Sequence, residues 1–150
     1  MTYLRLKSLI KGMLVGDNVI PQEEDTVIAL VETALLTTAT KADSLHLMTL
    51  STTADVLRLA QGDYLIRMPV PPTLDTDLID IDEELTPAVA RYVASYISAK
   101  KGGIHIQAAE RIILDYNAKT WEIFEQMEVE AAEDGVTDMC YTVPSTEFTL

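Results

Sequence analysis

Six carboxylates lie close together in the stretch LDTDLIDIDEEL, from Leu74 to Leu85. Clustered carboxylates can hold a divalent cation or act as a general acid and base, so this acidic run is the first candidate for chemistry. A structural role is the alternative, because acids at the start of a helix stabilise its free N–H groups. The six residues are Asp75, Asp77, Asp80, Asp82, Glu83 and Glu84.

The spacing of the run does not match a calcium-binding loop. An EF-hand that starts at Asp75 needs an acid or amide at its fifth position, glycine at its sixth and glutamate at its twelfth. Those positions hold Ile79, Asp80 and Thr86. No phosphate-binding glycine loop and no histidine nearby in the sequence completes a magnesium or acid–base site.

Apolar residues are interleaved with the acids at Leu78, Ile79, Ile81 and Leu85. This pattern predicts a chain that lies against the core and turns its polar side chains outward. The segment 82–84 then stands at the start of a helix, where carboxylates are favourable. We therefore expect a structural role for the run, with no metal and no cofactor.

The remaining candidates for chemistry are isolated. His46 and His105 are far apart and match no metal-ligand spacing. The acids around Cys140 would raise the pKa of a thiol, not lower it as reactivity requires. No GxSxG motif supports a serine nucleophile. The sequence predicts no catalytic residue and a protein that is not an enzyme.

Composition and charge further limit the kinds of protein that this chain could be. The 150 residues carry a formal net charge of −13, and 48% of them are hydrophobic. This is a globular composition, and strong negative charge disfavours specific DNA or RNA binding. No apolar run approaches the roughly 20 residues that span a bilayer, and a single cysteine forms no internal disulfide. We expect a protein made in the cytoplasm and not inserted in a membrane.

Periodicity predicts four helices around a β insertion. Apolar residues recur at helical spacing from Tyr3 towards Gly16, and a second helix follows Pro21. A two-residue period then covers about 44–68, with strands expected at 45–50, 56–59 and 64–68. A third helix runs from the acidic run to Lys100–Lys101, and a fourth from Ile104 to about Glu130.

These elements define the expected fold class. It is mainly α, a four-helix bundle-like core with an inserted short β-hairpin or sheet and an extended C-terminal tail. The helical domain comprises 1–130 and includes the β insertion. Residues 131–150 form an extended arm, since their apolar residues alternate loosely and Pro144 favours extended backbone.

The order of the elements resembles the head–tail adaptor (connector) proteins of tailed bacteriophages. The resemblance covers 1–130 and is sharpest over 57–117. One departure is Pro87, which requires the third helix to begin near Thr86 or to have a distorted first turn. The stretches that carry it are GDYLIRMPVPP, DIDEEL, AVARYVASYISAKKG and AAERIILDYNAKTWEIFE.

The resemblance implies a structural protein of the virion. Such adaptors assemble as rings, typically dodecameric, below the portal protein at the capsid vertex. They join the head to tail or neck proteins and extend the channel through which double-stranded DNA passes without specific binding. A wall rich in carboxylates suits such a channel because it repels phosphate. Portal and subunit contacts are expected at Tyr64, Ile66, Arg67, Trp121, Tyr141, Val143 and Phe148.

Two alternatives remain open at this stage. One is a different neck or tail-completion protein of a phage. The other is an acidic regulatory or metal-dependent protein. An adaptor is expected to form rings or bind a portal ring, a regulator to be monomeric or dimeric, and a metal-dependent protein to bind Mg²⁺ or Mn²⁺ measurably.

Overall fold

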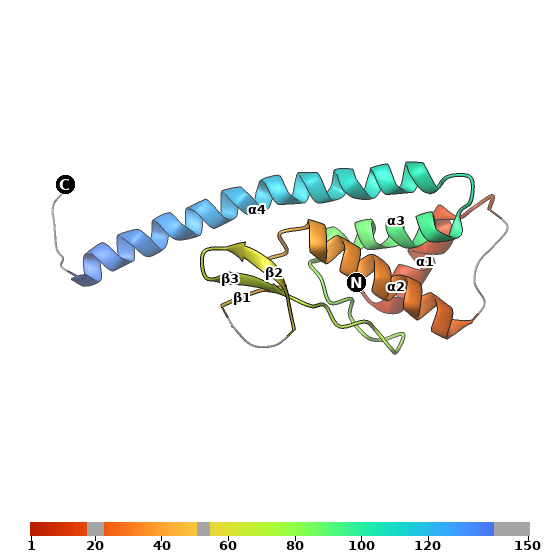
Figure 1. The fold of residues 1–150 in the computed structure, drawn as a ribbon, viewed down its shortest axis with the longest axis horizontal. Coiled ribbons are helices and arrows are strands. Elements are labelled where there is room, and N and C mark those ends of the chain that lie inside the picture. Colours follow the sequence, from red (N-terminus) through yellow and green to blue (C-terminus); the bar gives the residue numbers. More distant parts are fainter. Residues whose placement is uncertain (18–22, 51–54, 140–150) are drawn as a thin grey trace. The chain divides into compact units, whose positions relative to one another are not determined.

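A computed structural model describes residues 1–17, 23–50 and 55–139 of the chain (Figure 1). The chain divides into two compact units, Met1–Asn117 and Ala118–Leu150. The first contains three helices, the start of a fourth and a small sheet. The second consists, in its described part, of the continuation of the fourth helix. The mainly α fold with a small antiparallel sheet confirms the expected class.

The first two helices form where the sequence predicts them, but their bounds differ: the first ends at Met13, before Gly16, and the second begins at Glu24, after Pro21, which lies outside the described residues. Helix α1 (Tyr3–Met13) is capped by Thr2, whose hydroxyl accepts a hydrogen bond from the Arg5 N–H. After it the chain turns at Gly16, where φ is +93°, a conformation that glycine adopts without strain. Helix α2 (Glu24–Lys41) carries two acids in its first turn and a lysine in its last, as the helix dipole favours.

Helix α3 (Thr86–Ile97) is the central element of the first unit and packs against both α1 and α2. A single 3-10 turn, η1 (Glu83–Leu85), precedes it. Pro87 therefore stands in the first helical turn, where its missing N–H costs nothing. This resolves the departure noted in the sequence, since the helix begins at Thr86. Its buried residues include Ala88, Val89, Ala90, Tyr92, Val93 and Ala94.

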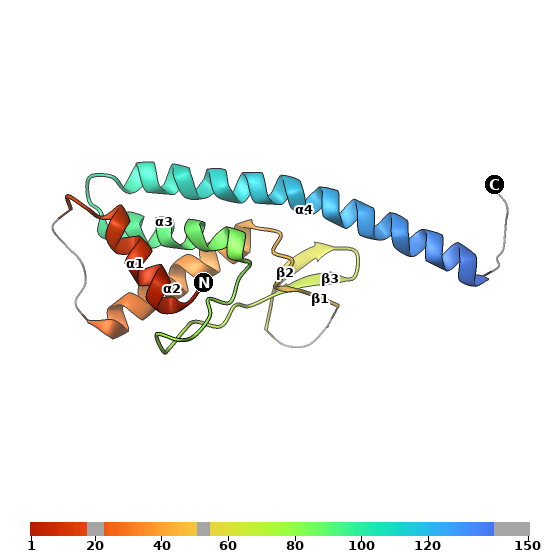
Figure 2. The same ribbon diagram turned by 180° about the vertical axis from the view of Figure 1, so that it is seen from behind.

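The sheet has three antiparallel strands in the order β1-β3-β2 (Figure 2). Strands β2 (Val56–Gln61) and β3 (Tyr64–Arg67) form the predicted hairpin around Gly62, where φ is +60°. The expected first strand at 45–50 is mostly wrong, because only β1 (Met48–Thr49) pairs with β3. The residues before it form a turn.

Helix α4 (Gly102–Met139) is longer than the sequence predicted. We expected it to end near Glu130 and an extended arm to begin at 131, and this is wrong for 131–139, which are helical. Ala131, Ala132 and Glu133 are strong helix formers. Because helix extension is cooperative, they carry the helix past Gly135 despite its cost of roughly 1 kcal/mol. The rest of the expected arm, 140–150, lies outside the described residues.

Candidate functional site

The acidic run lies against the core, as the sequence predicted, but its carboxylates are not simply turned to solvent. Ile79, Ile81 and Leu85 are buried and anchor the run. Asp80 and Asp82, in contrast, point into a network of hydrogen bonds with residues far away in the sequence. The expectation that the polar side chains face outward is therefore wrong for these two acids.

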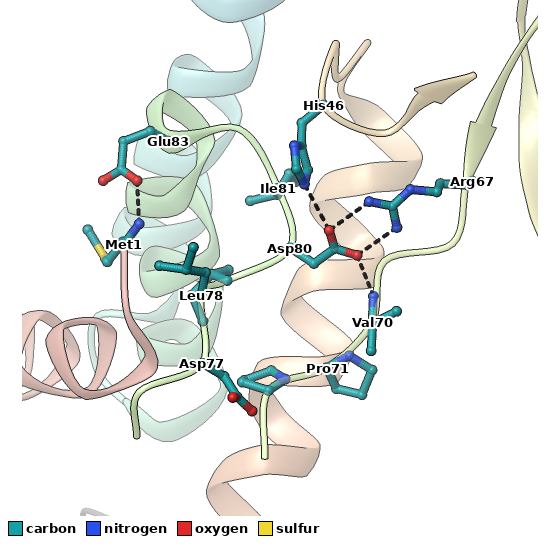
Figure 3. Close-up of a pocket in the computed structure, with 12 residues that line it drawn as sticks. Met1, His46, Arg67, Val70, Pro71, Asp77, Leu78, Asp80, Ile81 and Glu83 are labelled. Atoms are coloured by element: carbon teal, nitrogen blue, oxygen red, sulfur yellow. Dashed lines mark hydrogen bonds and ion pairs between the residues drawn. The ribbon is translucent and has the colours of Figure 1, made fainter. Parts of the chain in front are cut away.

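Asp80 is in hydrogen-bond contact with His46, Arg67 and Val70 (Figure 3). The two terminal nitrogens of the Arg67 guanidinium, Nη1 and Nη2, each donate to its carboxylate at 2.7 Å. The Val70 N–H donates at 2.8 Å, and His46 Nε2 lies 2.9 Å away. Burial opposes ionisation of Asp80, but these hydrogen bonds and the Arg67 charge outweigh it and hold its pKa at about 2.

Asp82 makes a second set of contacts, with the turn before β1 and with α4. The Ser44 hydroxyl and the His46 N–H both donate to its carboxylate. The Tyr116 phenol donates to the same carboxylate and accepts a hydrogen bond from the Leu45 N–H. Asp82 precedes η1 but makes no side-chain cap with it. Its role is to join the turn to α4, in place of the helix-capping role that the sequence indicated.

The first acids of the run also have local partners. The Asp77 carboxylate accepts hydrogen bonds from the Thr73 and Leu74 N–H groups and from the Thr73 hydroxyl. These bonds, those to the backbone foremost, lower its pKa. Asp75 pairs with Lys7 of α1 at 2.7 Å. The run therefore attaches to α1 at one end and to α4 at the other.

A groove of about 610 Å³ lies along the acidic run. In Figure 3 the His46–Asp80–Arg67 cluster borders one side of it, and Met1 and Glu83 lie on the other. Leu78 and Val70 expose 70% and 64% of their surfaces here. The groove thus presents apolar side chains between charges that are already paired.

Metal binding and membrane insertion can be tested against the described part of the chain. There, no three His, Cys, Asp or Glu side chains are grouped so that they could hold a metal ion. Nor does any helix in that part combine the length and apolar character that crossing a bilayer requires.

His105 is buried, whereas His46 is exposed. The His105 side chain is 3% exposed, and its Nδ1 lies 3.1 Å from Arg91 Nη1. Burial, and then the charges of Arg91 and Lys101, lower its pKa against an opposing effect of Asp17. Its neutral imidazole is a packing residue of the first unit. Cys140 lies outside the described residues.

The predicted interface residues fall into four groups. Ile66 is fully buried, so its assignment to an interface is wrong: its side chain fills the core where β3 meets the helices. Arg67 is only partly exposed, and its guanidinium binds Asp80. Tyr64 is half-buried and Trp121, in the second unit, is 46% exposed, so both present surface to solvent. The others lie outside the described residues: Tyr141, Val143 and Phe148.

Sequence reasoning missed the partnership of His46 with the acidic run. His46 and Asp80 are 34 residues apart, and no sequence-spacing pattern predicts a contact between a turn and a distant loop. One signal was available: Asp80 and Asp82 alternate with buried isoleucines, so both acids lie on one side of an extended chain. Comparison of the chain with protein families, curated proteins and solved structures found no match.

Proposed function

We propose that this chain is a structural adaptor of the head–tail type, which forms a ring below a portal protein and extends the DNA channel of a tailed phage. The observation that carries the proposal is the order of elements, α1-α2-sheet-acidic run-α3-α4, which is the order that the resemblance implies. The long α4 and the three-stranded insertion agree with that expectation.

The acidic run supports a scaffolding role over a catalytic one. Its carboxylates hold the sheet, the turn at 44–47 and α4 against one another, and Asp80 is already neutralised by Arg67. A subunit of a ring needs such hydrogen bonds and ion pairs between its elements, because its neighbours exert forces on it and it must not unfold under them. The formal charge of −13 also suits a channel that DNA passes without binding.

Attachment to portal-bearing capsids tests the proposal. The purified protein would be mixed with DNA-filled capsids that carry a portal but no tail, and the capsids sedimented and imaged by electron microscopy. We expect a ring of added density at the portal vertex and saturable co-sedimentation. Capsids assembled without a portal are the matched control. Equal binding to both kinds of capsid, or to neither, would contradict the proposal.

A further inference from the structure

Bases gather in two segments of this acidic chain. Residues 1–16 and 91–104 contain six bases and no acid, although the whole chain carries a formal charge of −13. The two segments comprise helix α1, the later part of α3 and the connection from α3 to α4. Helices α1 and α3 pack against each other within the first unit. The six bases are Arg5, Lys7, Lys11, Arg91, Lys100 and Lys101.

The end of α1 lies beside the connection between α3 and α4 (Figures 1 and 2). The charges of Asp17, just after α1, and of Lys101, in the connection, both act on the pKa of His105, as their proximity requires. Lys11, Lys100 and Lys101 are exposed. None of these three lysines forms an ion pair with an acid in the described part of the chain.

Apolar side chains lie beside these bases. Val15, one helical turn after Lys11, is 75% exposed, and Ile104, just after the connection, is 64% exposed. The first unit therefore has a surface that combines exposed bases with exposed apolar side chains. This surface, called the basic end below, consists of Lys11, Val15, Lys100, Lys101 and Ile104.

The later part of α4 has the opposite charge. Residues 121–139 contain seven acids and no base. Glu122 and Glu125 are exposed, and Trp121 beside them is 46% exposed. These three residues share one side of the helix, since they are separated by steps of three and four. Like charges at such spacings destabilise a helix, so a basic partner stabilises this one.

We propose that the acidic part of α4, residues 121–139, docks on the basic end of a second copy of the chain. Its carboxylates then meet Lys11, Lys100 and Lys101, and Trp121 meets the apolar side chains of the basic end. Opposite charges across a contact favour encounter and fix its register. The two copies contribute different surfaces, so the contact is head-to-tail, and a head-to-tail contact that closes on itself produces a ring.

Charge identifies a second copy as the occupant. Two bodies with a formal charge of −13 repel each other overall, so they associate only where a basic surface meets an acidic one. The chain supplies both surfaces itself. The proposal deepens the proposed adaptor function, since it names the contact between ring subunits. It is tested on free subunits, so it can fail while attachment to portal-bearing capsids succeeds.

Sedimentation velocity of the full chain over a wide concentration range tests the contact. We expect reversible association that continues beyond a dimer. Lys11→Glu and Lys100→Glu, each alone, should raise the dissociation constant about threefold to tenfold. The matched control is Lys41→Glu, at the end of α2 that lies towards the sheet (Figure 1). It makes the same change in formal charge, from −13 to −15, and should weaken association much less.

A mixing experiment separates this contact from general charge effects. Glu122→Lys/Glu125→Lys has a formal charge of −9, and Lys11→Glu/Lys100→Glu has one of −17. Each double variant alone brings like charges together and should associate weakly. In the mixture, the altered α4 meets the altered basic end, and the unaltered α4 meets the unaltered basic end. Association should therefore return.

Net charge alone predicts a different result, because the −9 variant would then associate more strongly than the wild type. Circular dichroism verifies that all variants remain folded. A monomeric wild type, undiminished association of the single variants, strong association of the −9 variant by itself, or no recovery on mixing would each overturn the proposal.

Discussion

Arg67 at the end of β3 and Asp80 in the acidic run are joined by two parallel hydrogen bonds of 2.7 Å. The pair closes the loop that leaves the sheet and returns to the helices. Asp80 also accepts a hydrogen bond from the Val70 N–H inside that loop. One carboxylate therefore holds the interior of the loop as well as its first residue, Arg67. This bidentate geometry is the strong form of an ion pair, because the planar guanidinium matches the carboxylate.

The first prediction concerns the loss of that pair. Arg67→Ala leaves a partly buried carboxylate without its main donors, and we expect a loss of about 1–3 kcal/mol of unfolding free energy. Arg67→Lys retains the charge but not the planar fork, and should lose less. Urea denaturation monitored by circular dichroism measures both. An Arg67→Ala protein within about 0.5 kcal/mol of the wild type would contradict the role given to this pair.

The second prediction follows from the pKa of Asp80. Its folded-state value of about 2 lies below the ordinary 3.8, so its stabilising effect is complete above about pH 4 and is lost as the pH falls towards 2. Solvent screening reduces the effect to about 1–2 kcal/mol. Other carboxylates titrate in the same window, so the measurement is the difference between wild type and Asp80→Asn. That difference should shrink between pH 4 and 2, and one that stayed constant would contradict the prediction.

A third prediction tests the contact between α4 and the turn before β1. Tyr116→Phe removes a hydroxyl that donates to Asp82 and accepts from the Leu45 N–H. Both hydrogen bonds are partly buried. We expect a loss of about 1–3 kcal/mol. Tyr96→Phe is the matched control, because Tyr96 is 40% exposed and its hydroxyl lies as far as 3.5 Å from that of Thr37. Equal losses in the two variants would argue against a specific role for Tyr116.

Much of this fold could be predicted from local patterns. The helix period placed α1, α2 and α3, and the alternation around Gly62 placed the β2–β3 hairpin. The end of α4 could not be read from its sequence, because Gly135 reads as a stop while the alanines before it favour continuation. The helix propensities of the alanines and of Gly135 oppose each other there, so they do not determine the helix end. The helix continues because extending an existing helix is cooperative.

The contacts of the acidic run were beyond local reasoning for a different reason. Alternation with Ile79 and Ile81 indicates which side of the chain Asp80 occupies, but not what covers that side. Arg67 and His46 reach it only because the sheet folds back onto the helices. Ile66 illustrates the same limit: an apolar residue in a short strand faces either the core or a partner, and tertiary packing decides between them.

The fourth prediction concerns His105. Its pKa is lowered, so the neutral form stabilises the fold fully above the ordinary value of 6.5, and stability is lost as the pH falls below 6.5 towards the folded-state value. His105→Gln should flatten this part of the stability curve relative to the wild type. Thermal unfolding at a series of pH values between neutral and mildly acidic measures it. A variant that loses stability on acidification as steeply as the wild type would contradict the prediction.

The last prediction separates core from interface within the sheet, using Ile66 and Leu59. Ile66 is fully buried, so Ile66→Ala should cost about 2–5 kcal/mol of unfolding free energy, as a large-to-small change in a packed core does. Leu59, on the edge strand β2, is 73% exposed, so Leu59→Ser should change stability by less than about 0.5 kcal/mol.

For attachment to capsids we expect the opposite order of effects: the change at Leu59 should matter more than a change at Ile66. Leu59 lies on the same strand as the partly exposed Val56, and an apolar surface at an unpaired sheet edge favours contact with another chain. Leu59→Ser should therefore lower co-sedimentation with portal-bearing capsids while leaving the fold intact. Ile66→Val, a milder core change, is the control that should attach normally. If Leu59→Ser attaches as well as the wild type, Leu59 is not one of the few interface residues on which attachment depends, and the prediction is wrong.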